Sequence, residues 1–273
     1  MRGMKLVILL TSLGCLMFAC NNADVKQKAK TDSSKDEAAA LIEDLQKKVQ
    51  QYPDSSGLRM QFAAALDSVG MYRQALAQMD SLIAKDSLNY GLWLTKGTVA
   101  EDAQDTLLAM RCYANAAHVY ETPEALLRLA NLYAETKNDR AIQICSRVKG
   151  MGLGRDNDAN CAFIVGVYYS RTHNLTEAMK YFDECIANNY TYMEAYIEKG
   201  LLFFDNKQYE KALEVFQFAA TVNNLYADAY YYQARCYEMM NKKDSAVLRF
   251  KQSLQLDPGL KEASERLKEL GAE

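Results

Sequence analysis

Proline, histidine and tryptophan are scarce in this chain of 273 residues. It contains three prolines, two histidines and one tryptophan. The two histidines, His118 and His173, have no serine, cysteine or acid nearby in an arrangement that suggests a catalytic triad or a metal site. The three prolines are Pro53, Pro123 and Pro258, and they fall at boundaries of the repeated units described below, as helix-breaking residues must.

Motifs for nucleotide and cofactor chemistry are also missing. The sequence has no phosphate-binding loop, no dinucleotide-binding fingerprint and no CxxC pair. Asp156, Asp158 and Asn160 have the spacing that begins a calcium loop, but Cys161 stands where that loop needs glycine and Val167 where it needs glutamate. The net charge of −3 argues against nucleic acid as a partner, which calls for a basic face. We therefore expect no enzymatic activity, no cofactor and no metal.

The first 20 residues have the pattern of a targeting segment rather than of a folded element. Arg2 and Lys5 form a basic start, and a mainly apolar run of thirteen residues follows from Leu6 to Phe18. A membrane-spanning helix needs about 20 residues, so this run is too short to be one. The run leads to Cys20, after which the sequence turns abruptly polar.

This ending resembles the signal peptide of bacterial lipoproteins, in which a peptidase cuts before a cysteine that carries lipid. The resemblance implies a signal peptide over residues 1–19, a lipid anchor at Cys20, and a place in the cell envelope at the outer membrane, facing the periplasm. Cys15 is a second candidate, and an ordinary secretory signal with an incidental cysteine is a further alternative. Residues 20–35 hold one β-branched aliphatic residue, Val25, and no aromatic one, which predicts a flexible tether.

One alanine recurs through the rest of the chain at nearly constant spacing. The gaps are 34, 32, 37, 34 and 34 residues, between Ala75, Ala109, Ala141, Ala178, Ala212 and Ala246. A period near 34 indicates a solenoid of stacked helical hairpins instead of one globular core. We expect six units within residues 56–260, namely 56–89, 90–122, 123–158, 159–192, 193–226 and 227–260.

The unit over residues 193–226 is the clearest. Its first helix carries Tyr196 and Gly200 on one stripe, its second carries Ala212 and Phe216, and Gly200 lets the two helices approach closely. These positions, in six ordered occurrences, resemble the tetratricopeptide repeat (TPR) family. The resemblance implies an all-α fold, a right-handed superhelical solenoid whose concave face is lined by the first helix of each unit, and a function in binding other proteins.

Capping helices are expected at both ends of the stack. Ser34 and Glu37 have the spacing of a capping box, so we expect the first helix to start at Ser34. Residues 36–53 of this helix are expected to form the N-terminal cap of the stack. Residues 261–273 are expected to form the C-terminal capping helix. The third unit is irregular, because the glycines at 150, 152 and 154 do not continue a helix. We expect a longer connection over residues 150–158, with a hinge or a change of pitch.

A second stripe on the first helices predicts where a partner would bind. In the fourth and fifth units this stripe is apolar, so it either packs between units or lines an exposed groove for an apolar peptide or an amphipathic helix. The candidate groove residues are Phe163, Val167, Ile197, Leu201, Phe204, Tyr231 and Arg235. A candidate acidic rim lies near the C-terminal ends of the first helices and consists of Asp67, Glu101, Glu135, Asp205 and Glu238. The rim either favours a basic partner or is simply solvated.

Five cysteines remain in the repeat region, and small buried side chains are the expectation for all of them: Cys112, Cys145, Cys161, Cys185 and Cys236. Cys145 and Cys161 lie on consecutive helices and could face each other, so a disulfide is possible in an oxidising compartment.

The sequence thus favours a lipid-anchored scaffold or adaptor of the bacterial cell envelope. It would bind a segment of an unknown partner protein, a component of an envelope complex, in the concave groove. The alternative is a structural TPR lipoprotein that associates with itself and has no separate client.

Overall fold

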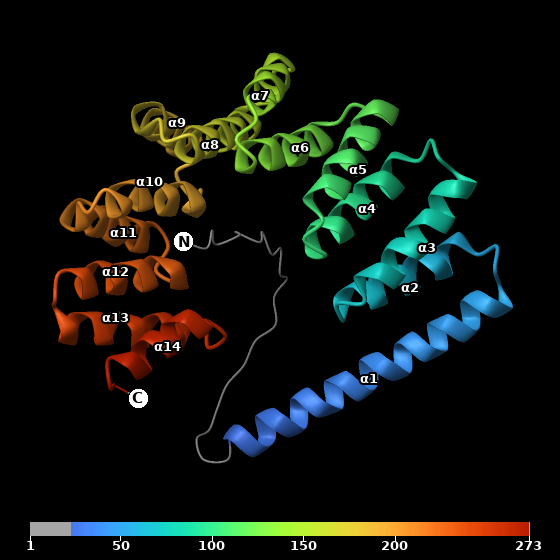
Figure 1. Cartoon of the computed structure of the whole chain (residues 1–273), viewed down its shortest axis with the longest axis horizontal. Coiled ribbons are helices and arrows are strands. Elements are labelled where there is room, and N and C mark those ends of the chain that lie inside the picture. Colours follow the sequence, from blue (N-terminus) through green and yellow to red (C-terminus); the bar gives the residue numbers. More distant parts are fainter. Residues whose placement is uncertain (1–22, 273) are drawn as a thin grey trace.

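The computed structural model describes residues 23–272, with side chains from residue 36 onward (Figure 1). This part of the chain forms fourteen α-helices and no strand, which confirms the predicted all-α class. The helices are α1 (Ala23–Gln51), α2 (Ser56–Ser68), α3 (Tyr72–Lys85), α4 (Tyr90–Asp102), α5 (Thr106–Val119), α6 (Pro123–Glu135), α7 (Arg140–Gly150), α8 (Arg155–Arg171), α9 (Leu175–Asn188), α10 (Met193–Asp205), α11 (Tyr209–Val222), α12 (Ala227–Met239), α13 (Lys243–Leu256) and α14 (Lys261–Glu269). The six helix pairs from α2–α3 to α12–α13 are the six predicted hairpins.

Polar side chains cap the starts of several helices of the stack. The side chains of Asn89, Asp105 and Asn174 each accept a hydrogen bond from the backbone N–H three residues further on. Such a bond satisfies one of the free donors at a helix start. Thr122 does the same for α6, whose first residue, Pro123, has a φ already suited to a helix.

The turn inside each hairpin ends its first helix in the left-handed conformation. A residue with φ near +60° occupies this turn in five hairpins, namely Gln104, Lys137, His173, Lys207 and Asn241. Gly70, with φ +78°, takes the place in the first hairpin. One left-handed residue satisfies the last carbonyls of a helix and redirects the chain. The second helix can therefore fold back directly on the first.

A glycine on the first helix brings the two helices of a hairpin together. A Cβ added to Gly200 would lie 2.5 Å from Cζ of Phe216, whose side chain is fully buried. The same relation joins Gly166 to Phe182 and Gly97 to Tyr113. The close approach predicted at Gly200 is therefore confirmed, and it recurs in two other hairpins.

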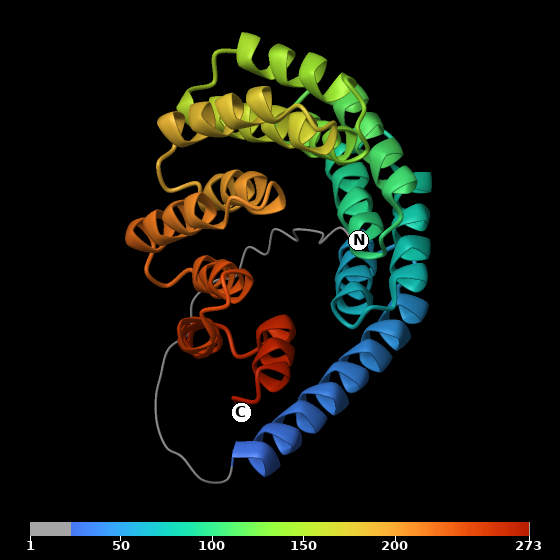
Figure 2. The same cartoon turned by 60° about the vertical axis from the view of Figure 1, so that its left-hand side comes forward.

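The hairpins follow one another around an open, C-shaped arc (Figure 2). In the C-terminal half the first helices of successive hairpins touch, α6 against α8, α8 against α10 and α10 against α12, whereas the second helices make no contact of comparable extent. The elements of a curved stack lie closest together on its inner side. The first helices therefore line the concave side.

The connection before α8 is shorter than the sequence suggested. We predicted a connection over residues 150–158, but α7 ends at Gly150 and α8 begins at Arg155. Gly152 (φ +64°) and Gly154 (φ +94°) turn the chain within four residues. Asp156 and Asp158 then lie in the first turn of α8, where negative charge is favourable.

The N-terminal helix is longer than predicted. We expected a tether over residues 20–35 and a helix from Ser34, but α1 already begins at Ala23, so the prediction was wrong for residues 23–33. The segment from Ala23 to Gln51 contains no glycine or proline that would interrupt a helix. Near its C-terminal end, Leu45 and Val49 pack on Phe62 and Leu66 of α2.

Among the described helices, none is both long and apolar enough to cross a membrane. The predicted signal peptide, with Cys20 and Cys15, lies outside the described residues. At the other end, α14 buries Ala263 and Leu267 against the last hairpin.

Candidate partner-binding surface

Four of the seven candidate groove residues belong to the core. Phe163, Val167, Ile197 and Tyr231 are each at most 5% exposed, so the prediction that they line an open groove was wrong. Their stripe packs between hairpins: the ring centroid of Phe163 lies 5.0 Å from that of Tyr192, in the connection that leads to the next hairpin. The apolar pattern was therefore inter-repeat packing, the other reading that the sequence allowed.

The remaining three residues form a half-buried patch on α10 and α12. We call Leu201, Phe204 and Arg235 the Phe204 patch; all three are intermediate in exposure. The guanidinium of Arg235 lies 5.8 Å from the ring centroid of Phe204 and donates a hydrogen bond of 3.2 Å to the Tyr231 hydroxyl. The patch combines an aromatic ring and a guanidinium from two neighbouring hairpins on the concave side, and Arg235 is also ion-paired at 3.4 Å with Glu238 of its own helix.

Three acids of the predicted rim are paired with arginines from another hairpin or from the capping helix α14. Glu101 lies 3.6 Å from Arg128 of α6, and Glu238 of α12 accepts a hydrogen bond of 3.2 Å from Nε of Arg266 in α14. The third acid, Glu135, pairs with an arginine of α8. These carboxylates therefore join first helices to one another or to the capping helix, and their charge is already compensated within the solenoid.

Arg171 is the centre of this network. It donates hydrogen bonds of 2.9 and 3.1 Å to Glu135 of α6 and of 3.0 and 3.1 Å to Glu198 of α10. Burial by itself lowers the pKa of Arg171, but the two carboxylates, Glu198 first, outweigh it and raise the pKa overall. One guanidinium thus ties three consecutive hairpins together. This network was not predicted from the sequence, although the spacing of about one repeat between Arg171 and each acid could have indicated it.

The other two rim acids, Asp67 and Asp205, have no basic side chain within ion-pair distance in the described structure. Burial raises the pKa of Asp67, and the nearby Asp102 raises it further. Its Oδ1 atom is buried without a hydrogen bond. Burial also raises the pKa of Asp205, next to Phe204 in sequence, and Arg171 partly opposes this effect. Uncompensated acidity on the rim is thus confined to these two positions.

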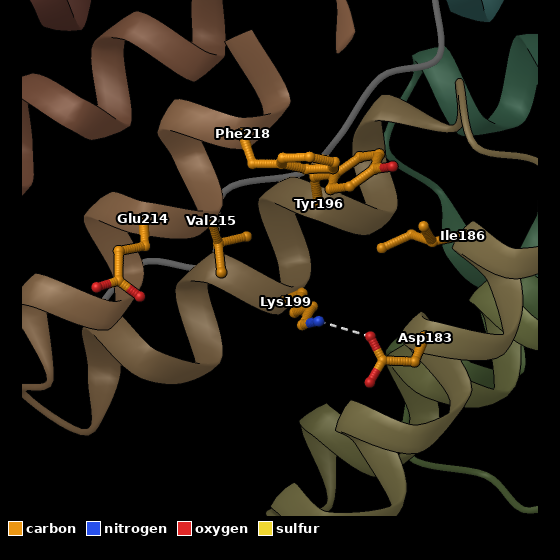
Figure 3. Close-up of a pocket in the computed structure, with 7 residues that line it drawn as sticks. All are labelled: Asp183, Ile186, Tyr196, Lys199, Glu214, Val215 and Phe218. Carbon is orange, nitrogen blue, oxygen red and sulfur yellow. Dashed lines mark hydrogen bonds and ion pairs between the residues drawn. The ribbon is translucent and has the colours of Figure 1, made fainter. Parts of the chain in front are cut away.

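A small pocket opens between α9, α10 and α11 (Figure 3). Its volume is about 280 Å³, and its lining residues are Asp183, Ile186, Tyr196, Lys199, Glu214, Val215 and Phe218. We call it the Phe218 pocket. Nζ of Lys199 forms an ion pair of 2.6 Å with Oδ1 of Asp183. No sequence prediction pointed to this site, because its residues come from three helices and belong to no common motif.

The five cysteines of the repeat region are all buried as free thiols. Cys145 of α7 and Cys161 of α8 face each other and share a hydrogen bond, which raises the pKa of Cys145 and lowers that of Cys161. Burial raises the pKa of both thiols, so it adds to the increase at Cys145 and opposes the decrease at Cys161. The juxtaposition that the sequence allowed is therefore present, with both sulfurs reduced.

No group of three or more histidine, cysteine or acidic side chains in the described part of the chain is arranged to hold a metal ion.

Helical hairpins stacked in an arc define a class of protein that works by presenting extended surfaces to other molecules. A family model described as tetratricopeptide repeat matches residues 165–220 and 197–260, which span most of the fourth hairpin and all of the fifth and sixth. No curated protein sequence matches the chain.

Several solved structures share the fold. A tetratricopeptide repeat protein from Parabacteroides merdae ATCC 43184 is 17% identical, with a TM-score of 0.69 over 89% of this chain and 96% of that one. PilW, described as a widely conserved type IV pilus biogenesis factor, is 15% identical, with a TM-score of 0.60 over 78% and 99%. A thermophilic TPR protein from Thermus thermophilus is 16% identical, with a TM-score of 0.56 over 67% and 98%. At these identities the structural likeness establishes the fold, which is a TPR solenoid. The match to the family model supports the interpretation of the chain as a TPR protein.

Proposed function

We propose that this protein is a lipid-anchored scaffold that binds a segment of a partner protein on the concave side of its fifth and sixth hairpins. The Phe204 patch is the observation that carries the proposal. It combines a partly exposed aromatic ring and a leucine on α10, next to Asp205, a carboxylate without a basic partner. An apolar side chain of the partner would pack on Phe204, and a neighbouring basic side chain would pair with Asp205.

Photocrosslinking in the cell tests the partner site. A benzoylphenylalanine at position 204 replaces one aromatic side chain with another, and one at Leu107, which is 75% exposed on α5, serves as the control. We expect one abundant envelope protein to be captured from 204 and not from 107. Capture of the protein itself would favour the self-associating alternative, and equal capture from both positions would contradict the proposed site.

A charge substitution provides a second test of the same patch. Phe204→Glu places a carboxylate in the patch and beside Asp205, so we expect capture of the partner to fall while the protein stays folded. The thermal unfolding midpoint is the control. A loss of several kcal/mol in stability would show instead that Phe204 is a core residue.

The lipid anchor is tested separately. The proposal assigns it to Cys20, where multiple acyl chains would hold the protein stably, since each buried methylene contributes about 0.8 kcal/mol. Cys20→Ala is expected to release the protein from membranes or to block its processing. Cys15→Ala is the matched control and should leave membrane fractionation unchanged; the reverse outcome would move the anchor to Cys15.

A further inference from the structure

Equivalent residues of the fifth and sixth hairpins surround an aromatic ring in two different ways. In both hairpins a tyrosine near the start of the first helix donates a hydrogen bond to a loop carbonyl six residues earlier. Tyr196 donates to Tyr190 at 3.0 Å and Tyr230 to Asn224 at 3.1 Å. The two rings are therefore fixed in the same way, which makes their surroundings directly comparable.

In the sixth hairpin the protein places its own cation on this ring. The guanidinium of Arg249 lies 5.9 Å from the ring centroid of Tyr230. Arg249 also donates a hydrogen bond of 2.7 Å to Gln252, one turn further along α13. A guanidinium over an aromatic face is a favourable arrangement. The Tyr230 ring of the sixth hairpin therefore already has a cationic partner from the same chain.

In the fifth hairpin the same two positions are apolar. Val215 stands 34 residues before Arg249, and Phe218 stands 34 residues before Gln252. The ring of Phe218 lies 5.7 Å from that of Tyr196, yet 56% of Phe218 remains exposed. The Phe218 pocket (Figure 3) therefore presents a valine and an exposed aromatic ring at the positions where the sixth hairpin holds Arg249 and Gln252.

The charge of the pocket favours a cation. Lys199 and Asp183 neutralise each other through their ion pair. Glu214 lies one turn before Phe218 on α11, is exposed, and has no basic partner among the described residues. One carboxylate on the pocket wall is thus left uncompensated, and its side chain is turned away from the exposed Phe218 ring (Figure 3).

We propose that the Phe218 pocket binds the side chain of an arginine from a protein partner, at a site separate from the Phe204 patch. The methylenes of that arginine would lie against Val215 and Ile186. Its guanidinium would stack on Phe218, and the exposed side chain of Glu214 would turn towards it to form the ion pair. Arginine suits the site better than lysine because a planar guanidinium can stack on a ring and pair with a carboxylate together. The volume of about 280 Å³ accommodates a single side chain.

The test uses N-acetyl-arginine amide as the probe and follows the methyl signals of Ile186 and Val215 by NMR. We expect saturable shifts at both residues, and none when N-acetyl-norleucine amide, which lacks the cation, replaces the probe. Glu214→Gln should weaken binding by about two- to fivefold, as expected for the loss of one exposed ion pair. Leu248→Gln is the matched control at the equivalent position of the sixth hairpin, and it should have no effect.

A double variant should block the site with residues that already occur at the equivalent positions of the sixth hairpin. Val215→Arg with Phe218→Gln copies the sixth hairpin and supplies an internal guanidinium for the Tyr196 ring. The shift at Ile186 should then be lost, with the circular dichroism spectrum and the unfolding midpoint retained as the controls of folding. The inference is overturned if the unsubstituted protein shows no saturable shift, if norleucine amide binds equally well, or if the double variant still binds.

Discussion

Replacing Gly200 by alanine tests the contact that holds the hairpins together. The added methyl would meet the ring of Phe216, which is fully buried and lies 2.5 Å away at Cζ. Carbon atoms pack best at about 3.5–4.0 Å, so the ring or the helix must retreat by roughly 1 Å. Overpacking of this kind costs about 1–3 kcal/mol.

The higher helix propensity of alanine opposes this cost. It contributes up to about 1 kcal/mol in a helix interior, so the net loss expected for Gly200→Ala is about 1 kcal/mol. The control is Gly57→Ala in α2, where an added Cβ meets nothing within 4 Å. The control should be neutral or slightly stabilising. Gly200→Ala should therefore be less stable than Gly57→Ala by about 1–2 kcal/mol.

Urea unfolding followed by circular dichroism at 222 nm measures these differences. A double-mutant cycle with Phe216→Leu sharpens the test, because removal of the ring makes room for the methyl. We expect the double variant to be more stable than the sum of the single effects by at least about 1 kcal/mol. If Gly200→Ala equals Gly57→Ala, or if the two effects simply add, the ring contact does not determine the packing of the hairpin.

Three further predictions concern charges and thiols. Asp67→Asn should stabilise the protein at pH 7, because burial and the Asp102 charge penalise the ionised group. Since the folded-state pKa is raised, this advantage should shrink as the pH falls through that pKa towards the unfolded value near about 3.9, which urea unfolding at several pH values would show. Arg171→Met should lower the free energy of unfolding by roughly 2 kcal/mol. This loss is smaller than for a fully buried ion pair because the arginine side chain is 28% exposed. An unchanged midpoint of urea unfolding would contradict the role of Arg171 in linking the hairpins. Refolding with oxidised glutathione should join Cys145 to Cys161 and stabilise by about 3 kcal/mol, with non-reducing peptide mapping as the readout and any other pairing as the contrary result.

The hairpins could be predicted from the sequence because the residues that form each hairpin lie within a single repeat unit. The alanine period, the turn residues and Gly200 are local features, and each acts within one hairpin. The partner surface was harder to predict because it depends on how adjacent hairpins pack. Phe163 and Phe204 are both aromatic residues of the candidate stripe. However, Phe163 is covered by Tyr192 from the following connection, whereas Phe204 keeps part of its surface open.

The arginine network was missed for a related reason. The acidic rim was interpreted as a series of charges available to a partner, but three of the five acids are compensated from another hairpin or from the C-terminal helix. An acid and an arginine about one repeat apart become neighbours only when the helices stack. Their pairing therefore depends on the twist between hairpins, which a single sequence does not state.

The irregular third hairpin is better explained as a change of pitch than as a hinge. Its second helix, α7, has 11 residues, where the second helices of the other five hairpins have 14. The shorter α7 is followed by a first helix, α8, that packs directly on α6 (Figure 1). Arg171 then joins α6, α8 and α10 through its two carboxylate partners. A hinge at residues 151–154 would have to break this bridge and the buried contact between Cys145 and Cys161, so the glycines turn the chain at a fixed angle.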